Sequence, residues 1–365
     1  MRVFHYYPRA LIGDGGVTKV VWRYLNAQIK YSVNKTYVIC ESYKGKENKN
    51  FIVIIKRINL IFFKIPILKI NKFSKNDVFI FHSVFLIENI IIASFLKFFD
   101  IKYYVIPHGG YNQKVINKNF LLKKIFIFVF ERSYLENSQA VLPFFKSEIL
   151  PIKNISSKII CHPLFHPFEA QRKFINKSRV NKNYISWIGR YDILVKGIDI
   201  MIEVYSKIPN KLKIPLILHG RDSTNSLDDI KKLIAKYNQE RFIRAYGPIN
   251  DELTKYKFIS ESKFFIHLSR NEGMGVAILE ALSLDVPVLI SNDVPMSVLI
   301  NKDRFSFTTN LEISEIVKKL SYLLEVKKII TKKKPSYIFK YFKDKDIALK
   351  IDKLFNLRGN KLPIN

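Results

Sequence analysis

The sequence predicts an α/β fold made of two doubly wound domains, each a parallel sheet covered by helices. The first observation is length, because 365 residues correspond to about two domains of roughly 150 residues each. The second is that short runs rich in β-branched and aromatic residues alternate with longer helical stretches, as in βαβ units. The third is that most glycines lie beside the ends of these short runs. We therefore expect two Rossmann-like domains that face a central cleft.

Nine short runs have the composition of buried parallel strands, since they are rich in Val, Ile, Phe and Tyr. The predicted strands are 2–7, 36–40, 78–81, 103–106, 184–188, 216–219, 242–245, 264–268 and 288–290. Longer helical stretches follow most of them. The predicted helices are 17–30, 86–99, 197–206, 228–237, 251–260 and 276–284. This order of elements gives one doubly wound sheet in each half of the chain.

The least regular stretch of the chain lies between residues 162 and 183. It contains Pro163, Pro167 and a run of polar residues, which is typical of a junction between domains. The predicted parts are an N-terminal Rossmann-like domain over 1–165, a linker over 166–182, a C-terminal Rossmann-like domain over 183–340 and a C-terminal helix over 341–365 that returns toward the first domain.

Glycine is scarce, with 13 residues in 365, so each one indicates a position where the backbone requires it. Most of them lie beside predicted strand ends. These are Gly13, Gly15, Gly16, Gly109, Gly110, Gly189, Gly197, Gly220, Gly247, Gly273 and Gly275. Ligands of open α/β sheets bind at the carboxyl ends of strands, where glycine lets a backbone amide approach a phosphate. The glycines therefore indicate a ligand-binding cleft.

The chain is strongly basic, with 61 Lys and Arg residues against 31 Asp and Glu and a formal net charge of +30. Such an excess predicts attraction to nucleic acid, anionic lipid or phosphorylated substrates. Residues 1–165 carry 25 basic and 9 acidic residues, and the other 200 residues carry 36 and 22, so the charge is spread along the chain. A functional polybasic surface and a bias in coding account for it equally well.

Composition also excludes several classes of protein. A hydrophobic fraction of 48% with a mean hydropathy near zero excludes a disordered chain. Two cysteines, Cys40 and Cys161, exclude a disulfide framework and are typical of a reducing compartment. Residues 1–7 lack the apolar core of a signal peptide. We therefore expect a cytoplasmic protein.

Two segments combine basic and large apolar residues. Residues 51–75 mix Phe, Ile and Leu with six Lys and Arg, and four lysines within 114–124 precede the apolar run 125–130. Such segments suit a bilayer surface, where each basic residue near anionic lipid contributes about 1 kcal/mol. Core elements with solvated lysines explain them equally well, so the sequence leaves peripheral contact with the inner face of the cell membrane open. The best candidate for a transmembrane span, 78–99, is interrupted by polar and charged residues.

Two loops after predicted strands are candidates for binding phosphate groups. Residues 13–19, Gly-Asp-Gly-Gly-Val-Thr-Lys, follow the first strand and open a helix, so their amides could bind a pyrophosphate or an acceptor group. A plain strand-to-helix turn is the alternative. Arg190 and Lys196 emerge six residues apart after the strand 184–188. Two cations there would neutralise a diphosphate, although two solvated charges remain the alternative.

The most informative segment is 269–282, Ser-Arg-Asn-Glu-Gly-Met-Gly-Val-Ala-Ile-Leu-Glu-Ala-Leu, which follows the strand 264–268. It places Glu272 in a loop and Glu280 in a helix. Eight residues at a helical rise of about 1.5 Å bring the two carboxylates to similar azimuths about 12 Å apart. This separation is too long for an acid and a base acting on one bond. It suits the two ends of an elongated ligand such as a nucleotide sugar.

Taken together, these motifs resemble family 4 of the retaining glycosyltransferases, which have the GT-B fold and fall within glycosyl transferases group 1. The motifs are the glycine loop near the N-terminus, Pro107-His108-Gly109-Gly110, Gly189-Arg190 with Lys196-Gly197, Gly247, and Glu272 with Glu280 in E-x7-E spacing. The resemblance spans nearly the whole chain, and its C-terminal half is the more specific.

The resemblance implies a role for each matching residue. The residues that it assigns to the donor are Gly15, Gly16, Arg190, Lys196, Gly247, Gly273, Met274, Gly275 and Glu280. Those that it assigns to catalysis are His108, Arg190, Lys196 and Glu272. Arg190 and Lys196 would bind the diphosphate and Glu280 the ribose hydroxyls. Glu272 and the amides that follow it would bind the transferred sugar, and His108 would lie near its reacting face. Gly15 and Gly16 would contact the donor phosphate or the acceptor.

The same resemblance implies the reaction. A sugar would move from a nucleoside diphosphate donor to a glycan or lipid-linked oligosaccharide, with retention of configuration, in surface polysaccharide biosynthesis. The N-terminal domain would lie on the acceptor side and the C-terminal domain would bind the nucleotide sugar. No cofactor, no catalytic metal and no nucleic acid is expected. Catalysis would consist mainly of positioning and of electrostatic stabilisation of the departing diphosphate.

Three other readings remain open at this point: a nucleotide-sugar epimerase of related fold, a sugar-binding protein without catalysis, and a basic nucleic-acid-binding protein, although no nucleic-acid recognition motif is evident. Asp344-Lys345-Asp346 has the D-x-D form of metal-dependent glycosyltransferases, but it lies at the start of an amphipathic stretch. We interpret it as a helix start. His82, His219 and His267 are expected to pack or to line the cleft.

Overall fold

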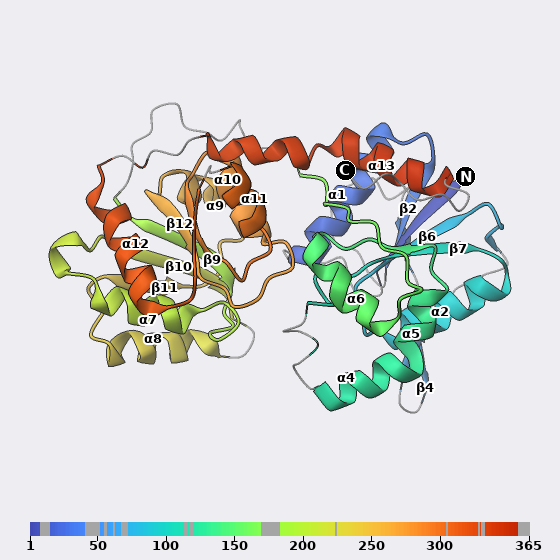
Figure 1. Cartoon of the computed structure of the whole chain (residues 1–365), viewed down its shortest axis with the longest axis horizontal. Helices are drawn as coiled ribbons and strands as arrows, with labels where there is room; N and C mark the ends of the chain where they lie inside the picture. The colour runs from blue at the N-terminus through green and yellow to red at the C-terminus, as the bar shows by residue number, and fades with distance from the viewer. Residues whose placement is uncertain are drawn as a thin grey trace. The chain divides into compact units, whose positions relative to one another are not determined.

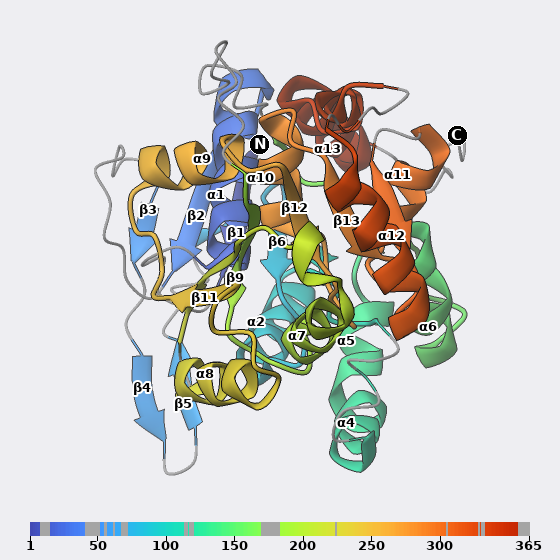
Figure 2. The ribbon, with the colours of Figure 1, turned by 90° about the vertical axis from the view of Figure 1, so that its left-hand side faces the viewer.

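The computed structural model of the chain contains two compact units. One comprises Met1–Phe168 together with Tyr341–Asn365, and the other comprises Glu169–Lys340. The described residues are 1–7, 15–40, 52–54, 57–60, 63–66, 72–112, 116, 120–168, 183–222, 225–303, 306–327, 329 and 333–356. Each unit is built around one sheet with helices on both faces (Figure 1, Figure 2). The predicted α/β fold is therefore confirmed, whereas most of the predicted linker, 166–182, lies outside the described residues.

The sheet of the first unit has six parallel strands in the order β3-β2-β1-β6-β7-β8. Its strands are β1 (Arg2–Tyr6), β2 (Lys35–Cys40), β3 (Ile52–Ile54), β6 (Val78–His82), β7 (Lys102–Ile106) and β8 (Ala140–Val141). Its helices are α1 (Gly16–Tyr31), α2 (Ile87–Phe98), α4 (Phe120–Phe126), the π-helix η3 (Ile127–Glu131), α5 (Arg132–Glu136), the 3₁₀ turn η4 (Lys146–Glu148), α6 (Ile149–Ile155) and α13 (Asp344–Asn356). The antiparallel pair β4 (Arg57–Leu60) and β5 (Phe63–Pro66) lies outside this sheet.

The last helix, α13, packs beside α1 on the first unit. Ser32 and Asn34, which follow α1, donate hydrogen bonds of 2.7 and 2.9 Å to Oδ1 of Asp352 on α13. Tyr104 on β7 donates a hydrogen bond of 2.9 Å to the carbonyl of Leu354. Asp344 begins this helix, so Asp344-Lys345-Asp346 is the helix start that the sequence predicts.

The sheet of the second unit is also parallel, in the order β11-β10-β9-β12-β13-β14. Its strands are β9 (Ile185–Arg190), β10 (Leu216–Arg221), β11 (Ile243–Tyr246), β12 (Phe264–His267), β13 (Val288–Ser291) and β14 (Phe307–Thr309). Its helices are α7 (Ile198–Lys207), η6 (Asn210–Leu212), α8 (Ser226–Lys236), α9 (Glu252–Ser260), α10 (Val276–Ser283), α11 (Ser297–Asp303) and α12 (Ile313–Glu325), and the 3₁₀ helix η7 (Pro335–Tyr341) follows.

Strand order locates the place where each sheet can bind a ligand. In both sheets the first strands along the chain lie in order from the centre to one edge, and the later strands lie in order from the centre to the other edge. The reversal falls between β1 and β6 in the first unit and between β9 and β12 in the second. Crevices form at the carboxyl ends of strands at such a switch point, and ligands of open α/β sheets bind there.

All nine predicted strands and all six predicted helices are present, with ends that differ by at most two residues. The strands β3, β8 and β14 are absent from the prediction because two or three residues are too few to show an alternating or apolar pattern. The prediction also names no helix over 120–155 or 297–325, so α4, η3, α5, α6, α11 and α12 are absent from it.

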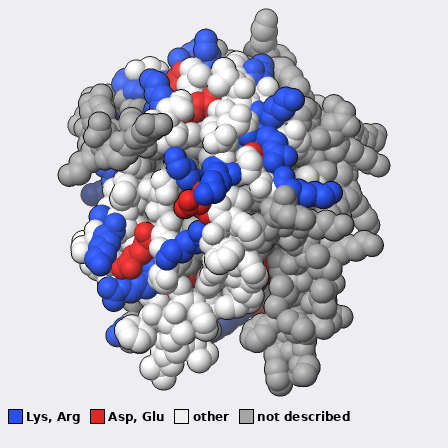
Figure 3. All heavy atoms as spheres, turned by 90° about the vertical axis from the view of Figure 1, so that its right-hand side faces the viewer, with Lys and Arg blue, Asp and Glu red and all other residues white. Residues whose placement is uncertain are grey.

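Basic residues are spread over the described surface. Figure 3 shows one face, on which Lys and Arg side chains outnumber Asp and Glu and leave areas of uncharged side chains between them. Among the described residues, no helix has both the length and the apolar character needed to cross a bilayer.

Candidate active site

The candidate site in the second unit lies where β9 and β12 run side by side. Their register pairs Phe264 with Ile185 and Phe265 with Ser186, so the loops that follow the two strands leave the same edge of the sheet. The backbone N–H of Arg270 donates a hydrogen bond of 2.9 Å to the carbonyl of Val195, which also accepts one of 2.9 Å from the Ser269 hydroxyl. These two hydrogen bonds join the loop that carries Lys196 to the loop that carries Glu272.

Gly197 allows this close approach. Its φ is +63°, in the left-handed region that favours glycine, and a Cβ on it would lie 1.9 Å from the carbonyl oxygen of Leu268. Gly247 is a matched contrast, since a Cβ there would meet no atom within 4 Å and its φ lies outside that region.

Gly197→Ala is therefore expected to destabilise the protein by more than the roughly 1–3 kcal/mol of a strained backbone alone, because the methyl group also collides with a strand carbonyl. Gly247→Ala is expected to change stability by less than about 0.5 kcal/mol. Urea unfolding of both variants tests this. Equal urea midpoints for the two variants would show that the loop accommodates the methyl group of Gly197→Ala without a loss of stability.

Lys196, Glu272 and His267 form one cluster at this edge. Nζ of Lys196 forms an ion pair with Oε1 of Glu272, and Nε2 of His267 lies 2.6 Å from the same oxygen. The Lys196 and Glu272 side chains are only 14% and 12% exposed, and His267 is 2% exposed. Because the carboxylate accepts, His267 carries its hydrogen on Nε2.

The charges in this cluster keep Glu272 ionised. Burial alone would raise the pKa of Glu272, but the Lys196 ammonium and the His267 imidazole outweigh burial and hold this pKa at about 2. The cluster therefore presents a carboxylate with an adjacent cation at neutral pH. Such a pair can accept hydrogen bonds from hydroxyl groups while attracting a phosphate.

A second ion pair braces the same loop. The guanidinium of Arg270 donates to both carboxylate oxygens of Asp199 on α7, at 2.8 and 2.7 Å, and to the carbonyl of Leu194 at 2.6 Å. The hydrogen bonds with Asp199 raise the pKa of Arg270. A bidentate pair fixes orientation as well as distance, so the loop between β12 and α10 is held against the start of α7.

Glu280 lies in α10, which begins after Gly275 at a φ of +74°. Its carboxylate is buried and forms an ion pair of 2.8 Å with Nζ of Lys255 on α9. The predicted separation of about 12 Å assumed helical rise over all eight residues. In the structure the helix covers only 276–283, so Glu272 precedes it and that estimate does not describe this segment.

The structure places the other predicted donor residues around the same strand ends. Arg190 ends β9 with its side chain 60% exposed and 3.5 Å from Asp192. Gly247 follows β11, and its carbonyl lies 2.9 Å from Nδ1 of His219. Gly273 and Met274 lie between Glu272 and the start of α10, and Met274 is buried. The structure thus brings Lys196 and Glu272 into contact, whereas Glu280 pairs with Lys255 and Arg190 with Asp192.

The remaining predicted residues belong to the first unit. Gly15 precedes α1 and Gly16 begins it, while the rest of the predicted glycine loop, 8–14, lies outside the described residues. His108 follows β7 at a φ of +53°. Its ring stacks edge-on against Phe144, and its Nε2 lies 2.8 Å from Nδ1 of His82.

The sequence prediction leaves out two contributors to the site, Lys255 and Asp199, and does not pair a third, His267, with Glu272. His267 is expected there only to pack or line the cleft, yet it contacts Glu272. Its position at the end of a strand, five residues before the glutamate, is the signal that could have identified it. Lys255 and Asp199 carry no such signal, because their partners lie 25 and 71 residues away in sequence.

Comparison with known proteins finds similarity in both sequence and fold. Residues 168–345 match the family model described as glycosyl transferases group 1. The O-antigen chain mannosyltransferase B of Escherichia coli is 28% identical over 163 residues, which cover 42% of this chain and 42% of that protein. The GDP-mannose:cellobiosyl-diphosphopolyprenol alpha-mannosyltransferase of Xanthomonas oryzae is 25% identical over 128 residues, which cover 32% and 33%. The matched segments thus span less than half of each curated relative.

Similarity of fold extends over the whole chain. The solved structure of Alr3699/HepE from Anabaena, in complex with UDP and glucose, superposes with a TM-score of 0.73 over 98% of this chain and 99% of that one, at 12% identity. Residues 168–345, just under half of the chain, are therefore similar to the glycosyl transferases group 1 family, and the two parallel sheets of the chain have the GT-B fold.

Proposed function

We propose that this protein is a metal-independent glycosyltransferase that moves a sugar from a nucleoside diphosphate donor to a glycan or lipid-linked oligosaccharide, with retention of configuration. The observation that carries the proposal is the buried cluster of Lys196, Glu272 and His267 at the switch point of the second sheet. The family model supports it because the match includes all three residues.

The cluster suggests how the donor is held. The Lys196 ammonium would attract the diphosphate, and the first N–H groups of α10 after Gly275 would add to this attraction. The ionised Glu272 would accept hydrogen bonds from hydroxyls of the transferred sugar. As the bond between sugar and phosphate lengthens, negative charge grows on the leaving diphosphate, and a cation fixed in advance stabilises that charge at no cost of reorganisation.

The names of the relatives support a role in surface polysaccharide biosynthesis. One is an O-antigen mannosyltransferase, and the other acts on a diphosphopolyprenol-linked sugar with GDP-mannose. We infer an acceptor of the same class, a growing glycan on a lipid diphosphate. Arg190, Gly247 and Glu280 would complete the donor site as the resemblance implies.

The proposal is tested by measuring the thermal stabilisation of the full chain by UDP-, GDP- and ADP-sugars, followed by transfer to a lipid-linked acceptor. A donor present at 100 times its dissociation constant should stabilise the protein by about 2.7 kcal/mol. The proposal predicts consumption of the donor only with acceptor and a product with the donor's anomeric configuration. An isomerised donor without acceptor would identify an epimerase, and binding of no donor would reject the proposal.

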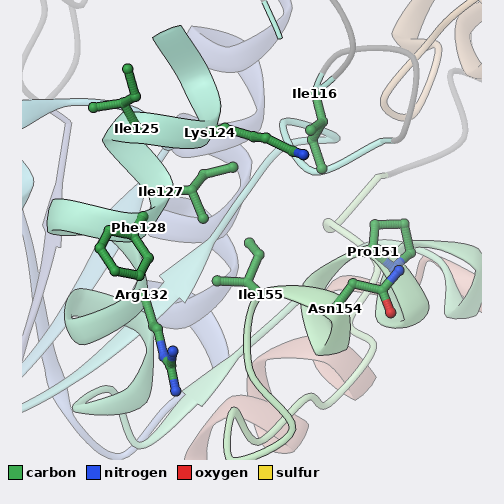
Figure 4. Close-up of a pocket in the computed structure, with 9 residues that line it drawn as sticks. All are labelled: Ile116, Lys124, Ile125, Ile127, Phe128, Arg132, Pro151, Asn154 and Ile155. Atoms are coloured by element: carbon green, nitrogen blue, oxygen red, sulfur yellow. The ribbon is translucent and has the colours of Figure 1, made fainter. Parts of the chain in front are cut away.

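We further propose that the first unit contacts an anionic membrane through α4 and η3. Lys123 and Lys124 lie beside large apolar side chains on these helices, and Leu122 and Phe128 are each more than 70% exposed. A cavity of about 520 Å³ opens next to them (Figure 4). Its lining consists of Ile116, Lys124, Ile125, Ile127, Phe128, Arg132, Pro151, Asn154 and Ile155. Apolar side chains beside lysines match the two layers of a bilayer surface, hydrocarbon and anionic head groups.

The double variant Leu122→Ser/Phe128→Ser is expected to bind phosphatidylglycerol vesicles at least about tenfold more weakly than the natural chain, because burying each side chain contributes about 1.5–3 kcal/mol. Co-sedimentation with vesicles measures this. Leu253→Ser in the second unit is the matched control, since Leu253 is 60% exposed on α9. Equal binding of the natural chain to neutral and anionic vesicles would contradict the role of the lysines.

A further inference from the structure

Three buried side chains of the first unit, Gln28, His5 and His82, form a continuous series of polar contacts with the half-buried His108. Oε1 of Gln28 on α1 lies within hydrogen-bond distance of Nε2 of His5 on β1. Nδ1 of His5 lies 2.8 Å from Nε2 of His82 at the end of β6, and Nδ1 of His82 lies 2.8 Å from Nε2 of His108 after β7. This series of hydrogen-bonded side chains therefore runs from α1, across the switch point between β1 and β6, to His108.

Burial keeps the imidazoles of this series neutral at pH 7 and outweighs the hydrogen bond with Gln28, which by itself would raise the pKa of His5. Gln28, His5 and His82 are fully buried, and burial lowers the pKa of His5 to about 4 and that of His108 to about 3. The pKa of His82 is also lowered by burial and by its two histidine neighbours. The other groups recorded around the chain are uncharged at neutral pH: Tyr24 lies against His5 and His82, Phe144 lies against His108, and His166 beyond Phe144 has a lowered pKa.

Neutral imidazoles in series permit only two arrangements of hydrogens. Each ring carries one N–H, and each N···N contact needs one hydrogen, so all the N–H groups point along the chain in the same direction. A carbonyl oxygen accepts and cannot donate. Because Oε1 of Gln28 faces His5, the hydrogen of His5 is on Nε2, and the hydrogens of His82 and His108 are on Nε2 as well.

We propose that Gln28, acting through His5 and His82, fixes His108 as the Nε2–H tautomer and so leaves its Nδ1 as a hydrogen-bond acceptor. This inference rests on the proposed function for its purpose. An acceptor nitrogen on His108 would receive a hydrogen bond from a hydroxyl of the transferred sugar or of the acceptor. Gln28, His5 and His82 are then positioning residues, since they act only through His108.

The buried amide of Gln28 makes the direction of these hydrogen bonds testable. Its Nε2 has no hydrogen-bond partner among the described residues. Rotating the amide would point its NH₂ group at His5, reverse every hydrogen bond in the chain and place the hydrogen of His108 on Nδ1. The tautomer of His108 therefore reports which end of the amide faces the histidines.

The test is ¹⁵N NMR of the full chain labelled in histidine, with the His108 signals identified by their loss in His108→Asn. Long-range proton–nitrogen correlations separate the two tautomers. We expect a pyrrole-type Nε2 and a pyridine-type Nδ1 for His108 at pH 7. The opposite tautomer, or rapid averaging of the two, in the natural chain overturns the proposal whatever the protein's activity. An absence of transferase activity with the expected tautomer would reject the proposed function alone.

Two variants at position 28 distinguish a role of Gln28 in setting the tautomer of His108 from a role in packing alone. Gln28→Glu keeps the shape of the side chain, and its carboxylate, when ionised, can only accept, so above the pKa of the new carboxyl we expect the Nε2–H tautomer. Gln28→Met has a similar volume but no acceptor, so we expect mixed tautomers and a fall in kcat of up to about a hundredfold with little change in the KM of the donor. If Gln28→Met keeps a single Nε2–H tautomer, Gln28 does not set the direction. If it fails to fold, the tautomers of the natural chain and of Gln28→Glu decide the question.

Discussion

Lys255→Met is expected to lower the free energy of unfolding by about 3–5 kcal/mol, because it removes the ammonium group that forms an ion pair with the buried Glu280 carboxylate. The two side chains are only 7% and 4% exposed and lie 2.8 Å apart. Glu252 also lies near Lys255, at 3.9 Å, but its side chain is 61% exposed, so water compensates it. The measurement is urea unfolding followed by tryptophan fluorescence and circular dichroism.

The double variant Lys255→Met/Glu280→Met is expected to recover most of this loss, since replacing a whole buried ion pair by apolar residues is often neutral or stabilising. Lys231→Met is the control on an exposed pair. Lys231 lies 3.7 Å from Asp228 on α8, both side chains are more than half exposed, and the change should stay below about 1 kcal/mol. Similar losses in Lys255→Met and Lys231→Met would show that the buried pair contributes no more than a surface pair.

The ion pair between Lys255 and Glu280 also concerns the proposed donor site. If Glu280 holds the ribose of the donor, Lys255 orients the carboxylate in the absence of ligand. The double variant, which is expected to fold, would then bind the nucleotide sugar more weakly than the natural chain. In the double variant we therefore expect nearly natural stability together with weaker binding of the donor.

Local pattern was sufficient to predict much of this structure. Strands such as Phe264–His267 are continuous apolar runs that end at a polar residue, and Gly197 and Gly275 mark turns that need a left-handed backbone. Local pattern placed Lys196 and Glu272 after strands, but their contact depends on β9 lying next to β12 and was not predicted.

Pairings across long stretches of sequence were not predictable in this way. Lys255 lies on a helix without a marked apolar face, and nothing in its neighbourhood indicates that it reaches Glu280. The imidazole chain of His5, His82 and His108 depends on strand order, because β6 lies next to β1 only after the chain has crossed the sheet. Strand order is a tertiary property that single-sequence pattern does not determine.

Glu272→Gln is expected to reduce kcat/KM for sugar transfer by about 10²–10³, the usual effect of removing one preorganised electrostatic contact to a transition state. The amide keeps the shape of the side chain but removes the charge that balances Lys196. Transfer from the nucleotide sugar, measured as nucleoside diphosphate released with acceptor present, tests this. Glu203→Gln on α7 is the matched control and should retain full activity. The ion pair recorded for Glu203 is with Lys207, at 3.7 Å.

The pH dependence of stability separates this effect from unfolding. The pKa of Glu272 is about 2 in the folded chain and about 4.3 in an unfolded one, so its ionised form stabilises the fold above pH 4.3, and that contribution is lost as the pH falls toward 2. Glu272→Gln should therefore show a shallower loss of stability between pH 4.5 and 2 than the natural chain. A variant that transfers sugar at the natural rate while showing this flattened acid profile would mean that Glu272 serves the fold and not the donor.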